Sequence, residues 1–374
     1  MRILIAPNAM KGSLSATDFA NAIAEGLLLA DNTLELLKRP LADGGDGTTE
    51  ILVNALNGNY IAAKIHDPLD RLIDSGFGWI EETKCAIIEM ADSSGLKLLS
   101  NQELNPMITS SFGTGELILN AVNRGASKII LGIGGSATVD GGLGMMKALG
   151  FRLLDCTGNE VPNGGDGLMQ LGRIETDQVS PELFKCEIIV ATDVVNQLLG
   201  EEGAARIYGP QKGATPLMVQ NLELGFKNYI QIIEHRSGKD LVQLTGGGAA
   251  GGLAIPLVAF LNATMVSGAE LVMEVLGVLA DIKNCDLVIT GEGCIDIQTC
   301  NGKGAAVIAV AAHNAGIPVI AIGGTVNHEA SSIFDGIFSI CSGPSSLEES
   351  VSNAYELTRL ASQELGKLLK SVLK

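Results

Sequence analysis

The sequence is poor in aromatic residues and in positive charge. Only 4% of its 374 residues are Phe, Trp or Tyr, although 46% are hydrophobic, so the core must consist mainly of Ala, Val, Ile and Leu. These residues are typical of parallel strands that lie buried beneath helices. The 25 Lys and Arg against 42 Asp and Glu give a net charge of −17, which argues against nucleic acid or a membrane surface as a partner.

Several metal-binding, redox and kinase signatures are absent. The seven cysteines are odd in number and form no CxxC pair, which indicates a reducing cytoplasm rather than a disulfide framework or a zinc site. The four histidines show no HExxH spacing. The chain contains neither a Walker GxxxxGK[ST] loop nor the HRD and DFG motifs of protein kinases, so any kinase activity would belong to another lineage.

Long hydrophobic runs are also missing. The uncharged segment 245–269 contains the run LAIPLVAFL, which is too short to cross a bilayer and is flanked by glycines, so we expect a buried helix there. The chain opens with the strand-like MRILIAP and shows no signal peptide.

Glycine is abundant, and its positions follow an alternation of strands and helices. The length predicts two domains. Strands are expected at residues 3–6 and 187–193, a helix at 15–30 with Ser15 as its cap, and antiparallel strands within 60–90. The clean alternation after residue 285 indicates an α/β protein with parallel strands, whose binding loops lie at the carboxyl ends of the strands.

Several of these strands end in loops that combine glycine with charged or hydroxyl residues. The loops are APNAMKGSLSA, LADGGDGT, SSFGTGEL, GIGGSATVDGG, ATDV and GEGCIDIQTCNGKG. Backbone amides and a lysine can orient phosphate oxygens, carboxylates can hold Mg²⁺, and a further carboxylate can activate a hydroxyl group. This combination of glycines, lysines, carboxylates and hydroxyl groups therefore favours phosphoryl transfer over a purely structural role for the loops.

The same residues permit other interpretations. Gly132, Gly134 and Ala137 fit the dinucleotide pattern G-x-G-x-x-A, with Asp155 at the spacing of a ribose contact, so an NAD-dependent dehydrogenase of a small hydroxy acid is the alternative. Against it, Asp140 adds negative charge where a pyrophosphate would bind. A non-enzymatic binding protein with a glycine-rich cleft is the third interpretation.

With these loops in view, the sequence resembles the bacterial glycerate kinase family. The segments that occur in the family's order over nearly the whole chain are APNAMKGSLSA, LADGGDGT, SFGTGELI, GIGGSATVDGG, YGPQKGA, GGGAAGGL and DLVITGEG. The resemblance implies phosphorylation of D-glycerate by ATP with Mg²⁺, with 2-phosphoglycerate favoured over 3-phosphoglycerate as the product. It also implies a Rossmann-like domain and a flavodoxin-like domain with added antiparallel strands, and an active site in the cleft between them. We expect the first domain at residues 1–64 with 283–374 and the second, inserted, at 65–282. The oligomeric state stays open between monomer and homodimer.

The roles of individual loop residues are inferred from their chemistry. Asp193 is expected to be the general base and Lys11 a catalytic cation, although Asp193 could instead cap a helix or bind Mg²⁺. Glu292 and Asp296 are the expected metal ligands. The remaining expectations are nucleotide contacts from Gly134, Gly135, Ser136, Thr138, Ser111, Thr114 and Lys303, and acceptor-substrate contacts from Asp43, Asp46 and Lys212.

The chain departs from the family pattern at four places. Asn8 opens NAM where the family has DSF, Cys294 replaces an arginine, and Val195 and Val139 replace an acid and an asparagine. An arginine can donate two hydrogen bonds to a carboxylate or a phosphate. Its replacement by Cys294 removes such a donor and therefore concerns the binding of the acceptor substrate.

Overall fold

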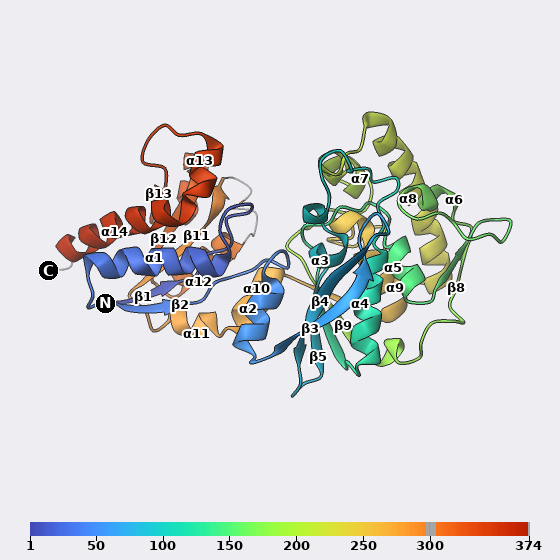
Figure 1. Cartoon of the computed structure of the whole chain (residues 1–374), viewed down its shortest axis with the longest axis horizontal. Helices are drawn as coiled ribbons and strands as arrows, with labels where there is room; N and C mark the ends of the chain where they lie inside the picture. Colours follow the sequence, from blue (N-terminus) through green and yellow to red (C-terminus); the bar gives the residue numbers. More distant parts are fainter. Residues whose placement is uncertain (297–298, 300–303, 373–374) are drawn as a thin grey trace. The chain divides into compact units, whose positions relative to one another are not determined.

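The chain folds as an α/β protein, as the sequence predicts. The computed structural model describes residues 1–296, 299 and 304–372. Two compact units form, one from Met1–Asp43 with Ala269–Lys374 and the other from Gly44–Gly268 (Figure 1). Each unit is built around its own β-sheet.

The first unit contains a five-stranded parallel sheet. Its order is β13 (Gly336–Ser339), β12 (Val319–Val326), β11 (Leu287–Ile295), β1 (Arg2–Ile5) and β2 (Glu35–Lys38). Helices α1 (Ala16–Ala30) and α14 (Ala354–Val372) lie side by side and bury Phe19, Ile23 and Leu365 in one core with the strands (Figure 1). Helix α12 (Gly304–Asn314) packs against β11 and β12.

Helix α1 begins where the sequence predicts. The Ser15 hydroxyl accepts a hydrogen bond from the Asp18 amide at 3.0 Å, which satisfies one of the free amides of the first turn. Further along the helix, a Cβ on Gly26 would lie 2.2 Å from the Arg359 carbonyl oxygen. Only glycine therefore permits the close approach of α1 and α14.

The second unit contains a six-stranded mixed sheet. Its order is β10 (Thr264–Val266), β9 (Glu187–Ala191), β6 (Lys128–Gly132), β5 (Cys85–Glu89), β4 (Leu72–Ile80) and β3 (Asn59–His66). The first four strands are parallel, whereas β4 runs antiparallel to both β3 and β5. The antiparallel strands predicted within residues 60–90 are thereby confirmed.

Helices and a small hairpin complete this unit. The main helices are α2 (Thr48–Ala55), α4 (Phe112–Asn123), α5 (Leu143–Ala148), α8 (Pro216–Ser237) and α9 (Ala254–Leu261). Helix α9 is the buried helix expected within 245–269, and no helix in the described parts of the chain is long and apolar enough to cross a membrane. Between β6 and β9 the chain also forms α6 (Asp166–Gln170) and the two-stranded sheet of β7 (Arg152–Leu154) and β8 (Arg173–Glu175), strands too short for a periodic signal in the sequence.

The shorter helices connect these elements. They are α3 (Ala91–Ser94), α7 (Ala204–Tyr208), α10 (Gly268–Val275), α11 (Val278–Ile282), α13 (Leu347–Ser352) and the 3₁₀ turns η1 (Leu96–Leu98), η2 (Leu183–Lys185), η3 (Pro210–Lys212), η4 (Ala249–Gly252) and η6 (His328–Ile333).

The boundaries between the units differ from those expected at 64/65 and 282/283. Residues 44–64 belong with the second unit because β3 pairs with β4 along its whole length, from Asn59 opposite Trp79 to His66 opposite Leu72. Residues 269–282 belong with the first unit. The sequence pattern marks where elements change, but strand pairing decides to which unit each element belongs.

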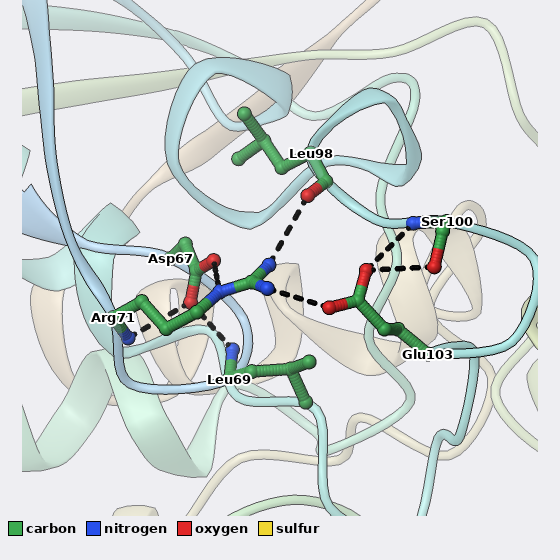
Figure 2. A network of polar contacts seen from close by, with 6 residues as sticks. All are labelled: Asp67, Leu69, Arg71, Leu98, Ser100 and Glu103. Carbon is green, nitrogen blue, oxygen red and sulfur yellow. Dashed lines mark hydrogen bonds and ion pairs between the residues drawn. The ribbon is translucent and has the colours of Figure 1, made fainter.

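A buried acid and an arginine fix the segment that precedes α4 (Figure 2). Arg71 donates through Nε to Asp67 Oδ2 at 2.6 Å, and through its terminal nitrogens to Glu103 Oε1 and the Leu98 carbonyl. Asp67 is 2% exposed and also accepts from the Leu69 amide. The network therefore ties the β3–β4 turn to residues 98–103, which lead toward the start of α4.

Candidate active site

Two of the predicted glycine-rich loops lie against each other in the second unit. The Gly134 amide donates to the Gly44 carbonyl at 3.0 Å. A Cβ on Gly132 would lie 2.6 Å from the Gly44 oxygen, and one on Gly134 would lie 2.6 Å from the Gly45 Cα. Glycine is thus required for the contact, which brings residues 44–46 to the carboxyl end of β6, where ligands of parallel sheets bind.

Asp140 is an internal anion in the second of these loops. Its carboxylate is fully buried and accepts from the Ser111 amide at 2.9 Å and the Ser111 hydroxyl at 2.7 Å. It also accepts from the amides of Gly142 and Gly144 at 3.0 and 3.2 Å. Because Ser111 caps α4 and Gly142 caps α5, a single carboxylate satisfies the N-termini of both helices.

The dehydrogenase alternative finds no support in this arrangement. A dinucleotide's pyrophosphate needs the helix N-terminus that follows the glycine turn, and here Asp140 already occupies it. The Asp155 carboxylate, expected to bind a ribose, instead accepts from the amides of Thr157 and Asn159 in its own turn. The hydrogen bond of the Thr157 hydroxyl, followed by these amide hydrogen bonds, lowers the pKa of Asp155.

Ser111 and Thr114, predicted as nucleotide contacts, are both fully buried. The Ser111 hydroxyl donates to Asp140 and accepts from the Met145 amide at 3.0 Å. The Thr114 hydroxyl lies 2.9 and 2.8 Å from those of Ser93 and Ser94. Both hydroxyls therefore link α4 to neighbouring segments from inside the protein.

Ser136 and Thr138, also predicted to meet the nucleotide, lie directly above Lys212. The Lys212 ammonium is buried and donates to Ser136 Oγ at 2.7 Å and to the Thr138 carbonyl at 2.8 Å. Burial lowers the pKa of Lys212 to about 7, although the charge of Asp140 opposes the shift. Gly135, at the tip of the loop, is exposed.

Sequence reasoning missed a charged cluster beside the same loop. Asp46, which it did predict, lies 3.9 Å from the position of a Cβ on Gly135, and Lys97 bridges Asp46 and Asp92 at 3.0 and 2.7 Å. Glu89 is buried and accepts from the Thr49 amide at 2.6 Å. Burial, together with the charge of Asp92, raises the pKa of Glu89 to about 7. Only the end of a buried strand at Glu89 could have indicated this cluster from sequence.

Asp193 follows β9 at the same edge of the sheet. Its Oδ1 accepts a hydrogen bond from the Ser267 hydroxyl at 2.7 Å, and Ser267 follows the neighbouring strand β10. The next helix along the chain, α7, begins only at Ala204 after Gly203, so Asp193 does not cap that helix. The side chain is partly exposed, so it can meet a ligand.

In the first unit, the loop after β1 lies beside β11. A Cβ on Gly293 would be 3.4 Å from the Met10 Cα and 3.6 Å from the Lys11 amide nitrogen. The Lys11 side chain is 77% exposed and its Nζ lies 3.9 Å from Asp43 Oδ2, so its charge is available to a ligand. The structure thus brings together two residues that the sequence places 32 positions apart.

The predicted metal ligands follow one another on β11 and the turn after it. Glu292 is buried, whereas Asp296 accepts from the Thr299 amide at 3.3 Å and from the Cys294 thiol at 3.5 Å. Within residues 1–296, 299 and 304–372, no group of three or more His, Cys, Asp or Glu could hold a metal ion. Lys303, predicted as a nucleotide contact, lies outside the described residues.

Asn8, one of the departures from the family pattern, lies under the start of α12. It is 6% exposed, and a Cβ on Gly304 would be 2.6 Å from its amide nitrogen. In the described part of the chain its Oδ1 has no hydrogen-bond partner. The neutral amide therefore fills a site in which the family's charged acid would need compensation.

Comparison with known proteins identifies relatives along almost the whole chain. Residues 3–370 match the model of the glycerate kinase family. A glycerate kinase of Halalkalibacterium halodurans is 41% identical over 97% of both chains, and a glycerate 2-kinase of Escherichia coli is 40% identical over 99% of this chain and 98% of the relative. The crystal structure of a Salmonella typhimurium LT2 protein assigned as glycerate kinase 2 superposes with a TM-score of 0.85, at 41% identity, over 100% of this chain and 99% of that one.

Proposed function

The chain belongs to the glycerate kinase family, and from this membership we propose that it transfers the γ-phosphoryl group of ATP to the 2-hydroxyl group of D-glycerate. The observation that carries the choice of hydroxyl is the 40% identity, over 99% of the chain, to a relative named glycerate 2-kinase. The cysteine pattern supports the cytoplasm as the compartment.

Asp193 is the proposed general base. Its carboxylate would accept the proton of the glycerate hydroxyl while that oxygen attacks the γ-phosphorus and ADP leaves. Support comes from its partial exposure at a strand end and from the 2.7 Å hydrogen bond of the Ser267 hydroxyl, which orients the carboxylate.

Lys11 is proposed to neutralise negative charge on the phosphates of ATP directly. Glu292 and Asp296 are proposed to do so by binding Mg²⁺. Two carboxylates suit Mg²⁺, which usually takes one or two protein carboxylates and fills its remaining positions with water and phosphate oxygens. When bound, the ion would neutralise charge on the transferring group. Asp43 lies within reach of Lys11 and would hold that cation in position until an anion arrives.

A coupled ADP-release assay tests the proposed function. ATP, Mg²⁺ and D-glycerate should release ADP, L-glycerate should be a poor acceptor, and NMR of the product should show the phosphoryl group on carbon 2. No turnover combined with tight NADH binding would contradict the proposal, and phosphorylation of carbon 3 would correct its regiochemistry.

Replacement of Lys11 by Met should lower kcat/KM roughly 10²-fold, because a cation near the transferring phosphate is lost. Stability should hardly change, since the Lys11–Asp43 pair is mostly exposed and such pairs contribute about 0–1 kcal/mol. Steady-state kinetics and thermal unfolding measure the two effects. Lys64→Met is the matched control, because Lys64 forms a similar surface pair with Asp74 at 3.6 Å. Equal kinetics in the two variants would make Lys11 an ordinary surface charge.

Replacement of Cys294 by Arg should lower the KM for glycerate roughly tenfold, which corresponds to about 1.4 kcal/mol. The physical reason is that a guanidinium can bind a carboxylate through two hydrogen bonds, whereas the exposed Cys294 thiol is a weak donor that already donates to Asp296. Cys156→Arg, at another exposed cysteine, controls for added charge. If the KM for ATP changes instead, the side chain at position 294 contacts the nucleotide and not glycerate.

A further inference from the structure

Lys212 is the last residue of a short 3₁₀ turn that lies between two helices. After α7, the turn η3 (Pro210–Lys212) ends at Gly213, which has a φ of +90° and would place a Cβ 2.3 Å from the Leu104 carbonyl oxygen. Thr215 then caps α8. A turn held at both ends by helices directs the lysine inward, although lysine is rarely buried without a partner.

The buried ammonium reaches the underside of the loop that follows β6. Its Nζ donates to Ser136 Oγ at 2.7 Å and to the Thr138 carbonyl at 2.8 Å. The Tyr229 hydroxyl of α8 donates to the Gly141 carbonyl a few residues further along. Lys212 and Tyr229 thus hold the loop after β6 from its buried side, and Lys212 is the one of the two that can carry a positive charge.

The upper side of the loop faces outward at Gly135. The carbonyl of Gly135 accepts from the Leu96 amide at 2.9 Å, and the Ala137 amide donates to the Ser94 carbonyl at 2.8 Å. Within the described residues, neither the Gly135 nor the Ser136 amide donates to a protein acceptor. The turn therefore keeps amide donors that suit an oxyanion, one at Gly135, which is exposed, and one at Ser136, which is buried beside Lys212.

We propose that Lys212 is a positioning residue for the transfer reaction, which fixes the Gly134–Thr138 turn from beneath so that its outer amides receive an anionic oxygen of a substrate. The proposal rests on the kinase function proposed above. It replaces the expectation that Lys212 contacts the acceptor itself, because the ammonium is buried and its two hydrogen bonds run to the loop.

Proton uptake on binding follows from the burial of Lys212. The charged group that influences Lys212 is Asp140, whose negative charge raises the pKa of the lysine. Tyr229 stays protonated, because burial raises its pKa well above the usual value. Because burial lowers the pKa of Lys212 to about 7, its amine and ammonium forms are both accessible near neutral pH. An anion on the turn favours the charged form. Binding near pH 7 should therefore be accompanied by proton uptake.

Calorimetric titration in buffers of different ionisation enthalpy measures this uptake. Mg·ADP and D-glycerate are titrated separately. The ligand whose binding is accompanied by proton uptake is the one that places an anionic oxygen on the turn. Lys212→Met should abolish the Lys212-dependent uptake and lower kcat/KM about 10²-fold, as expected for a misplaced loop. Lys239→Met, which removes an ammonium bound to the Val258 carbonyl and Asn262, should leave both unchanged.

Ser136→Ala provides a second test if Lys212→Met fails to fold. It keeps the lysine and removes one acceptor, so uptake should persist while KM for the same ligand rises several-fold. Wild-type uptake in Lys212→Met, or wild-type KM in Ser136→Ala, would overturn the proposal. Lys212-dependent uptake without any phosphorylation of glycerate would instead overturn the proposed kinase function and leave the role of Lys212 intact.

Discussion

Asp193→Asn should reduce kcat by roughly 10²–10⁴-fold while the affinity for Mg·ATP is retained. The substitution keeps the shape of the side chain and its ability to accept from the Ser267 hydroxyl, but it removes the basic carboxylate. Asparagine caps a helix about as well as aspartate, so a loss of capping cannot account for the effect. Single-turnover kinetics with D-glycerate, together with nucleotide titration, measure the chemical step and the affinity separately.

The other role considered for Asp193 gives a different result. If the carboxylate binds Mg²⁺, the variant should require more metal, and excess Mg²⁺ should restore part of the activity. Asp240→Asn, at an exposed position of the same unit, is the matched control and should behave like the wild type. A near-normal kcat in folded Asp193→Asn would end the assignment of this residue as the base.

Asp140→Ala should destabilise the protein by about 4 kcal/mol and abolish activity as a consequence. The buried carboxylate accepts four hydrogen bonds, from two Ser111 donors and from the amides of Gly142 and Gly144. Each bond to a charged acceptor contributes about 1.5–3 kcal/mol, but relief from burying the carboxylate charge offsets part of their sum, so the net cost falls in the range of about 3–5 kcal/mol. Urea denaturation followed by circular dichroism measures the change.

Two further variants test whether the loss of stability is specific to the hydrogen bonds of Asp140. Ser111→Ala removes one of the four hydrogen bonds and should cost about 1–2 kcal/mol, whereas Asp166→Ala at an exposed helix start should change stability by no more than about 0.5 kcal/mol. A loss below about 1 kcal/mol in Asp140→Ala would mean that water replaces the carboxylate at both helix N-termini.

Much of the site could be predicted from local sequence because it depends on loops at strand ends. The sequence predicts glycine-rich loops at the ends of strands, whereas the contact between residues 44–46 and 132–134 is seen only in the structure. Glu89, Lys97 and Ser267 could not be predicted, because each acts through a partner distant in sequence. The roles assigned to Asp193, Lys11, Glu292 and Asp296 stay predictions until the variants are measured.

The sequence by itself determined the α/β class, the family and the positions of the polar loops. These depend on hydrophobic periodicity, on glycine where φ must be positive, and on ordered motifs, all of which are local properties of the chain. Only the tertiary structure decided how each polar group is used. It showed that Asp140 takes the helix N-termini that a pyrophosphate would need, and that Lys212 points beneath its loop instead of into solvent. Burial and hydrogen-bond partners are set by segments far apart in the chain, so no local pattern contains them.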